Sequence, residues 1–323
     1  MNSGELNLKR VYEVQGRITQ LGYDKTSTKI IPPHSVLIGL AGQGKTRGTA
    51  AMNYVELCTN QSIASILPSD SFYSEFLYQN VESRYKELRD ISSGDGGRGG
   101  LNLQMIYNLY IPHCSMQEQK KIGDFLYLLD QRIAIQNKVI EKYESLIKAL
   151  AHEIIGKNAP NTMLSECVCC TSSTLKESDL SDGGAVPAYG AAGISGFIDS
   201  ALSDGDSILI TKDGSGVGSL RYVVGHHSFV GTLNSMTPKE GVYLPYIYYA
   251  LQNVCFESYR TGQAIPHIYF KDYGKEALYC PSFDDQKRLA KGLEMIDAKI
   301  GIERAAIQNL QLVKAYLLSA MFI

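Results

Sequence analysis

The strongest constraint on the fold is an internal repeat that spans almost the whole chain. Gln119-Lys-Lys-Ile precedes a long apolar-periodic stretch, and Gln286-Lys-Arg-Leu precedes a similar one. Upstream, Ser35-Val-Leu-Ile-Gly corresponds to Ser207-Ile-Leu-Ile-Thr. Solenoid repeats run to roughly 20–50 residues, so these copies lie too far apart for a solenoid. The pattern instead predicts a duplicated module, a globular domain followed by a long helix, and a duplicated binder suits a duplicated, spaced target.

The repeat predicts an α+β protein with pseudo-two-fold internal symmetry. We expect a first mixed α/β domain at residues 1–112, a long helix at 113–157, a second domain at 158–281 and a second long helix at 282–323. The chain has 323 residues and 44% hydrophobic content, enough for a core in each half. The first half is shorter at its N-terminus than the second, so its opening strand is expected to be missing or reduced.

Local patterns predict the elements within each domain. A helical spacing of aromatic residues covers 72–88, and a second helix is expected at 243–259. Ser92–Gly100 and Gly262–His267 are expected to be loops. The strands are expected at Ile30–Leu40, Gln61–Leu67, Ile106–Ile111, Val186–Ile198, Ser207–Thr211, Arg221–Val224 and Phe229–Met236.

Each long helix carries apolar residues at alternating spacings of four and three, as in a coiled coil. The first seam is expected to run from Ile122 to Ile154, and the second from Leu289 to Met321. At ~1.5 Å per residue the first helix would be ~55 Å long. The two helices most simply pair with each other, antiparallel. The polar Gln136 and Glu303 occupy the same seam position, and we hypothesise that they meet and fix the register of the pair.

Gly39-Leu-Ala-Gly-Gln-Gly-Lys45-Thr46 matches the phosphate-binding P-loop pattern. A P-loop must open a helix, yet the following Arg47–Tyr54 has no apolar helical stripe. The corresponding segment of the second half keeps its glycines but has Val217 where Lys45 stands. A shared glycine-rich strand-turn-strand explains both copies. An ATP- or GTP-hydrolysing enzyme built on Gly39–Thr46 remains the alternative function.

The repeated motifs resemble the specificity (S) subunits of type I restriction–modification systems. The recurring pattern of that family is a strand ending in proline, then Gln-Lys/Arg-x-Ile/Leu and a helix with Leu/Ile-Asp-x-x-Ile. It fits Ile111-Pro112 with Gln119–Ile133, and Cys280-Pro281 with Gln286–Ile300. The strand-plus-glycine signature of the family fits Val36–Gly48 and Ile208–Gly218.

The resemblance implies a DNA-binding subunit without chemistry of its own. Each globular domain would be a target-recognition domain that reads one half of a split sequence, and the helices would form a coiled-coil spacer that sets the gap. Two methyltransferase (M) subunits and the restriction/translocase (R) subunits would be its partners. S-adenosylmethionine, Mg and ATP would be cofactors of those partners, and this chain would hold none. A ~55 Å rod exceeds the ~34 Å turn of a DNA duplex.

DNA contacts require basic or polar side chains on loops that can approach phosphates and base edges. Neighbouring glycines would let the backbone come close to the duplex. The chain has a net charge of −2, so such contacts must come from local patches. The candidate DNA-binding residues are Lys45, Thr46, Arg47 and Arg98 in the first half, and Lys212, Ser215, Arg221, Arg260, Gln263 and His267 in the second.

Other functional classes have weaker support. The Cys167-Val-Cys169-Cys170 cluster has no second pair at zinc spacing, so no metal site is predicted. No nucleophile lies in a recognisable catalytic signature, and no catalytic residue is predicted. No apolar run reaches the ~18 residues of a membrane span. The seven cysteines form no regular framework and no signal peptide leads the chain, so we expect reduced thiols, a cytoplasmic location and no membrane contact. A coiled-coil scaffold without a nucleic-acid role is a third possibility.

Overall fold

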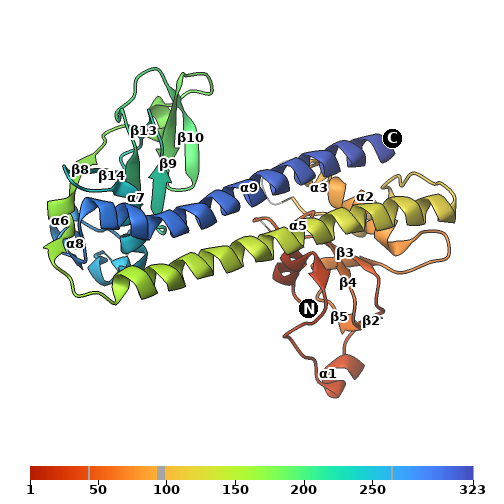
Figure 1. The fold of residues 1–323 in the computed structure, drawn as a ribbon. Helices are drawn as coiled ribbons and strands as arrows, with labels where there is room; N and C mark the ends of the chain where they lie inside the picture. The colour runs from red at the N-terminus through yellow and green to blue at the C-terminus, as the bar shows by residue number, and fades with distance from the viewer. Residues whose placement is uncertain (43, 93–98, 263–264, 323) are drawn as a thin grey trace. The chain divides into compact units, whose positions relative to one another are not determined.

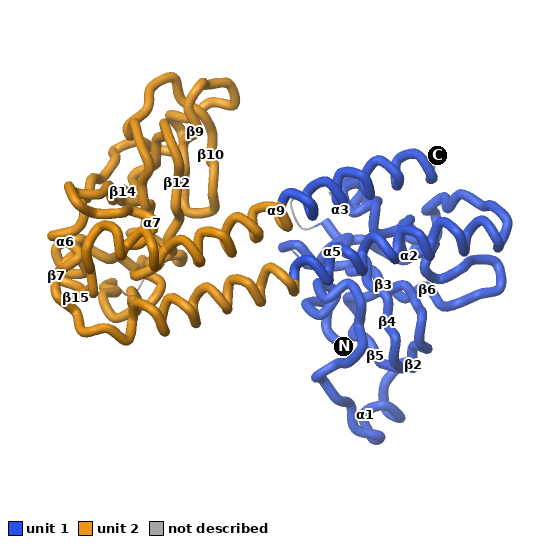
Figure 2. The backbone as a smooth tube through the Cα atoms, viewed as in Figure 1, with its two compact units in different colours: residues 1–137, 305–323 blue, residues 138–304 orange. Residues whose placement is uncertain are grey.

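The computed structural model describes residues 1–42, 44–92, 99–262 and 265–322, which form two compact units. Unit 1 comprises Met1–Asn137 and Ala305–Ile323, and unit 2 comprises Lys138–Arg304 (Figures 1 and 2). Each unit contains a sheet, the short helices that cover it, and a part of both long helices. The fold is therefore the expected duplicated α+β architecture.

Unit 1 is built around a four-stranded sheet in the order β1-β4-β3-β6. Strand β3 (Val36–Gly39) pairs antiparallel with β4 (Ala50–Asn53) and β6 (Ile63–Ile66), and β1 (Arg10–Val11) lies parallel to β4. The remaining elements of this unit, apart from the long helices, are the 3-10 helix η1 (Ser3–Leu8), α1 (Gln20–Asp24), β2 (Ile30–Ile31) paired with β5 (Leu57–Cys58), α2 (Ser74–Ser83), α3 (Tyr85–Ile91) and α4 (Leu103–Tyr107).

Successive strand residues point to opposite faces of the sheet, and the side chains on both faces are buried. Val36 and Ile38 pack with Met52 and with side chains of α2 and α3. Leu37 and Ala51, on the other face, pack with residues of η1, β1, β2, β5 and β6. The N-terminal segment thus closes one side of the unit and contributes an edge strand.

Unit 2 has an antiparallel four-stranded sheet in the order β12-β11-β14-β8. Its strands are β11 (Ser207–Thr211), β12 (Leu220–Val223), β14 (Leu233–Pro238) and β8 (Val168–Ser172). Strands β3, β4 and β6 of unit 1 correspond to β11, β12 and β14. The other elements are β7 (Thr162–Met163) with β15 (Ala277–Leu278), α6 (Leu164–Cys167), η3 (Glu177–Asp179), β9 (Val186–Gly190), β10 (Gly193–Ile198), β13 (Ser228–Phe229), α7 (Leu244–Ala250), η4 (Leu251–Asn253), η5 (Phe256–Tyr259) and α8 (Phe270–Tyr273).

The two long helices form where the seams predict them. Helix α5 (Met116–Ala151) continues into a π-helical turn, η2 (His152–Gly156), and α9 spans Phe283–Met321. A serine caps each start: Ser115 Oγ accepts from Glu118 N–H at 3.2 Å, and Ser282 Oγ accepts from Asp285 N–H at 3.3 Å. Every residue of both expected seams is buried or half-buried.

Within each unit, the segments of α5 and α9 run antiparallel (Figure 1) and are joined by an ion pair. In unit 1, Lys314 Nζ lies 2.6 Å from Asp130 Oδ1. In unit 2, Arg304 Nη2 lies 2.6 Å from Glu144 Oε1. The helix segments within each unit thus have the expected antiparallel orientation.

A buried glutamine at the start of each long helix joins the helix to its unit. Gln119 Oε1 accepts from Tyr73 N–H at 2.8 Å, and its Nε2 donates to the carbonyls of Ser71 and Cys114 at 3.2 and 3.0 Å. We call these bonds the glutamine clamp of unit 1. The repeat motif Gln-Lys thus has a structural cause, because the glutamine connects the segment before α2 to the start of α5.

Unit 2 contains the same arrangement, the glutamine clamp of that unit. Gln286 Oε1 accepts from Tyr243 N–H at 2.8 Å, and its Nε2 donates to the carbonyls of Gly241 and Pro281 at 3.3 and 2.9 Å. Both glutamines are 1% exposed. Tyr73 and Tyr243, which stand just before α2 and α7, are therefore equivalent positions in the repeat.

A charged cluster attaches β1 to the rest of unit 1. The Arg10 guanidinium donates to both Glu75 carboxylate oxygens at 2.6 Å and lies 3.3 Å from Asp130 Oδ2. It also lies over the rings of Tyr78 and Tyr127, 4.7 Å from each centroid. Burial alone would lower the pKa of Arg10, but the hydrogen bonds and charge of Glu75 outweigh burial and raise it. We call this arrangement the Arg10 site.

Some expected elements are wrong. The expected strand Ile106–Ile111 does not form: its first two residues belong to α4, which the Asn102 side chain caps by accepting from Met105 N–H at 2.9 Å, and residues 108–111 are in no strand. The helix expected at 243–259 ends as α7 at Ala250 and continues as short 3-10 turns. There the Asn253 side chain donates to the Ala151 carbonyl at the end of α5.

Three of the expected strand segments are interrupted, and one of them, Val186–Ile198, forms the antiparallel strands β9 and β10. The strand expected at Phe229–Met236 is divided into β13 and β14, where Gly231 N–H bonds to the Leu175 carbonyl outside the sheet. The strand expected at Ile30–Leu40 is divided into β2 and β3, and His34 between them has a positive φ of 64°.

Candidate nucleic-acid interface

The P-loop match belongs to a β-hairpin in the structure. Strand β3 ends at Gly39, and the chain returns antiparallel as β4 without opening a helix. The loop carbonyls of Gly44 and Lys45 accept hydrogen bonds from Arg89 and Tyr85 of α3, at 2.6 and 3.2 Å. A P-loop presents backbone N–H groups to phosphates ahead of a helix. Nothing in the described residues of this hairpin supports the ATP- or GTP-hydrolysing alternative.

The hairpin loop has the same hydrogen-bond pattern in both units. Gly48 N–H bonds to the Gly39 carbonyl at 2.9 Å, and Gly218 N–H bonds to the Thr211 carbonyl at 2.9 Å. Gly48 and Gly218 have positive φ values of 79° and 85°, which favour glycine at this turn. The expected strand-turn-strand shared by both copies is confirmed. Each unit therefore presents an equivalent glycine-rich loop beside its sheet.

In unit 1, the structure places three candidate DNA-binding residues in the β3–β4 loop. Lys45 is exposed, Thr46 is half-buried, and the Arg47 side chain is half-buried and donates to the Gly99 carbonyl. Arg98 lies outside the described residues. Lys45 is therefore the candidate of this loop whose cation is most available to a phosphate.

In unit 2, a carboxylate brings two of the candidates together. Asp213 accepts from Lys212 Nζ at 2.6 Å and lies 2.7 Å from His267 Nδ1. Burial alone would raise the pKa of Asp213, but the hydrogen bonds from His267 and Lys212 outweigh burial and lower it. Main-chain bonds from Gly214 to Pro266 and from Ile268 to Lys212 join the same two segments. The sequence did not indicate Asp213, because the first half has no equivalent acidic residue and the repeat therefore did not single out this position.

The remaining candidates of unit 2 lie in separate places. Ser215 is exposed in the β11–β12 loop, and Arg260 is exposed and pairs with Glu257 at 2.6 Å. Gln263 lies outside the described residues. Arg221 is exposed on β12 and lines a cavity of about 470 Å³ together with Lys148 and Arg304. Those two cations were also missed, because each belongs to a long helix whose pattern indicated only pairing.

The two proposed register residues lie on different long helices and in different units. Gln136 is buried on α5 within unit 1. Glu303 is half-buried on α9 within unit 2 and pairs with Lys299 at 2.9 Å.

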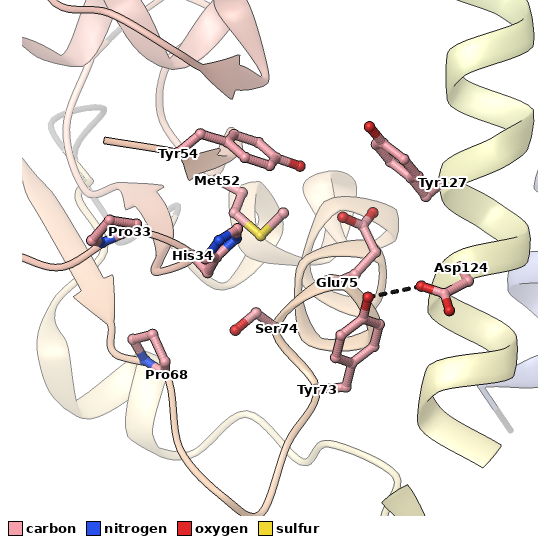
Figure 3. Close-up of a pocket in the computed structure, with 10 residues that line it drawn as sticks. All are labelled: Pro33, His34, Met52, Tyr54, Pro68, Tyr73, Ser74, Glu75, Asp124 and Tyr127. Atoms are coloured by element: carbon pink, nitrogen blue, oxygen red, sulfur yellow. Dashed lines mark hydrogen bonds between the residues drawn. The ribbon is translucent and has the colours of Figure 1, made fainter. Parts of the chain in front are cut away.

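A pocket in unit 1 has a different chemical character from the loops. It is a cavity of about 510 Å³. Its walls carry the tyrosines Tyr54, Tyr73 and Tyr127 and the acids Glu75 and Asp124 (Figure 3). Tyr73 Oη donates to Asp124 at 2.7 Å, and burial raises the pKa of Tyr73 to about 12, so the phenol stays protonated. The Asp124 carboxylate disfavours a DNA phosphate here, whereas the charge of Glu75 is balanced by Arg10.

Metal and membrane sites have no support within the described ranges. No group of three or more histidine, cysteine or acidic side chains there could hold a metal ion. No helix among those residues is long and apolar enough to cross a membrane.

Comparisons with known proteins agree on one family. A family model described as "Type I restriction modification DNA specificity domain" matches residues 2–145 and again 168–312. A type I restriction enzyme specificity subunit, MjaIX, of Methanocaldococcus jannaschii is 29% identical over 42% of this chain, a match that spans about a third (32%) of the relative's length. A putative type I specificity subunit of Mycoplasma pneumoniae is 24% identical over 77% of this chain and 72% of its own.

A solved structure shares the fold. The crystal structure of a type I restriction–modification S subunit from M. genitalium matches with a TM-score of 0.62 at 20% identity, covering 91% of this chain and 84% of that chain. Each of the two segments that the family model matches contains its own glycine-rich loop and its own glutamine clamp.

Proposed function

We propose a mode of DNA recognition for this protein that starts from its family. The chain belongs to the type I restriction–modification DNA specificity family and is a DNA sequence-recognition subunit. Each unit would read one half of a bipartite target. The observation that supports this proposal is the duplicated scaffold, in which the same hairpin, glycine turn and glutamine clamp occur in both units. Two equivalent readers on one chain suit two separated half-sites.

The long helices would set the gap between the half-sites. Each unit holds one segment of α5 against one segment of α9 through its own ion pair, so the helices belong to both readers. We propose that Gln136 and Glu303 fix the register of the pair as a polar layer in an apolar seam. A change of register would then change the gap length without changing either half-site.

The chain would work without chemistry of its own. Two methyltransferase subunits and restriction/translocase subunits would dock onto it, carrying S-adenosylmethionine, Mg and ATP, in the cytoplasm. A methyltransferase must flip its target base out of the duplex, so a subunit that holds the duplex in position contributes directly to modification.

Removing one exposed cation from each unit tests the proposal. We expect Lys45→Ala and Arg260→Ala each to weaken DNA binding of the assembled methyltransferase complex by ~1–3 kcal/mol, and each lost phosphate contact to reduce the salt slope by about one. The effects of the two changes should add, because they lie in separate readers. Binding is measured by fluorescence anisotropy across a salt series.

The matched control is Lys142→Ala, an exposed lysine on α5 outside both loops. Its DNA affinity and salt slope should equal those of the wild type. If both variants also kept wild-type affinity and slope, Lys45 and Arg260 would not contact DNA. ATP binding to the purified chain that is lost in Lys45→Ala would revive the nucleotide-binding alternative.

A further inference from the structure

The repeat gives each residue that surrounds Arg10 in the Arg10 site a counterpart in unit 2. The equivalence of Tyr73 with Tyr243 places α2 on α7, and that of Gln119 with Gln286 places α5 on α9. The paired positions along these helices are Glu75 with Pro245, Tyr78 with Tyr248, Gln79 with Tyr249, Tyr127 with Glu294, and Asp130 with Asp297.

One contact shows that this equivalence is also spatial. Gln79 Nε2 donates to Asp130 Oδ2 at 2.7 Å in unit 1, and Tyr249 Oη donates to Asp297 Oδ2 at 2.9 Å in unit 2. The second residue of each pair stands eleven positions after the clamp glutamine. The aspartate of the repeat is therefore held by the same helix position in both units.

In unit 2, the counterparts of the Arg10 site line a small cavity. It has a volume of about 170 Å³ and is lined by Tyr222, Pro245, Tyr248, Tyr249, Glu294 and Asp297. We call it the unit 2 pocket. Four of the corresponding residues in unit 1 (Glu75, Tyr78, Tyr127 and Asp130) contact the guanidinium of Arg10 directly. The unit 2 pocket thus corresponds in position to the guanidinium site of unit 1, but none of the described residues that line it is an arginine.

The carboxylates of the unit 2 pocket have fewer partners than those of unit 1. Asp130 is bound by Arg10, Lys314 and Gln79. Among the described residues, Asp297 receives one hydrogen bond, from Tyr249, and Glu294 receives one, from Tyr243. Burial raises the pKa of Asp297 by more than the hydrogen bond from Tyr249 and the charge of Arg304 lower it, so this carboxylate is desolvated with only partial compensation. A cation placed here would supply that compensation.

We propose that the unit 2 pocket receives the guanidinium of an arginine side chain from a protein partner. Two carboxylates and three tyrosine rings match a planar cation that accepts both ion pairing and stacking. DNA is the wrong partner, because its phosphates would meet two acids. The proposal rests on the function proposed above and adds to it a docking point for a protein subunit.

The surface of α9 beside the pocket supports a protein as the source of the arginine. Met295 follows Glu294 directly and is 68% exposed, and Ile302 lies seven positions further on, on the same face of the helix, and is 62% exposed. Large apolar side chains left in solvent along one helix face are typical of protein interaction surfaces. An arginine entering the pocket would then lie beside an apolar contact.

The test measures the affinity of the full-length chain for the methyltransferase subunit encoded with it, by calorimetry without DNA. We expect the isosteric double change Glu294→Gln with Asp297→Asn to weaken association at least tenfold, because a buried charge pair would lose both acids. The matched control, Glu141→Gln with Asp284→Asn, removes the same charge from exposed positions of the same unit and should keep wild-type affinity.

A second variant is expected to increase the affinity, so this part of the test does not depend on a loss of binding. Pro245→Glu restores the acid that Glu75 provides in unit 1, at the start of α7, where an acidic residue favours the helix. It should tighten association several-fold and should be reversed by adding Asp297→Asn. Competition with N-acetyl-arginine amide should weaken the wild-type complex more than competition with N-acetyl-lysine amide.

Several outcomes would overturn the proposal. They are unchanged affinity in the pocket double variant, an equal loss in the control, or no gain with Pro245→Glu. A crystal structure of the complex with Arg221 or Arg304 of this chain inside the pocket would overturn it as well, since both line the adjoining cavity. If the wild-type chain does not bind the methyltransferase subunit at all, the proposed function fails instead.

Discussion

Replacing Arg10 with alanine is expected to unfold unit 1 at a much lower denaturant concentration while unit 2 keeps its stability. The change removes the cation paired with Glu75, which is 5% exposed, and leaves that buried carboxylate with the hydrogen bond from Gln79. Breaking a buried ion pair from one side costs ~3–5 kcal/mol. The loss also releases the ring contacts with Tyr78 and Tyr127 and detaches β1 from its position beside β4.

Hydrogen exchange during urea unfolding separates the two units in this experiment. Amides of β3 and β4 should lose protection early in Arg10→Ala, whereas amides of β11 and β12 provide the internal reference. Arg132→Ala removes an exposed arginine of α5 and should leave both sets unchanged. Equal protection of β3 and β4 in Arg10→Ala and the wild type would show that the Arg10 site does not stabilise unit 1.

Alanine in place of either clamp glutamine is expected to destabilise the unit that contains it by ~2–4 kcal/mol. Each side chain satisfies one backbone N–H and two backbone carbonyls, and each unsatisfied buried group costs ~1–3 kcal/mol. Gln119→Ala should act on unit 1 and Gln286→Ala on unit 2. The magnitudes should be similar, because the two clamps have the same bonds and the same 1% exposure.

Thermal unfolding followed by circular dichroism, combined with hydrogen exchange, measures both effects. The controls are Gln117→Ala and Gln311→Ala, exposed glutamines on α5 and α9, whose unfolding should match the wild type. A clamp variant with wild-type protection in its own unit would mean that the repeated glutamine has no structural role there.

The repeat and the helix seams made the duplicated fold predictable. Periodicity along the two long helices reflects a physical requirement, because a residue on a pairing face must be apolar every three or four positions. The same seams correctly indicated an antiparallel pair. The glycines at 48 and 218 were also informative, since both have a positive φ that the shared turn requires.

Short elements were less predictable, because capping and local side chains decide them. Asn102 turns an apolar segment into α4, and Asn253 binds the end of α5 instead of extending α7. The pairings that shape the candidate interface are long-range. Asp213 meets His267 across 54 positions, and Arg10 meets Asp130 across 120 positions, separations that no local pattern records.

The most direct test of bipartite recognition is a genome-wide map of modified bases in cells that express this chain with its methyltransferase subunit. The account predicts one motif made of two specified segments with a fixed, unspecified gap between them. A single continuous motif, or modification that does not depend on this chain, would contradict it.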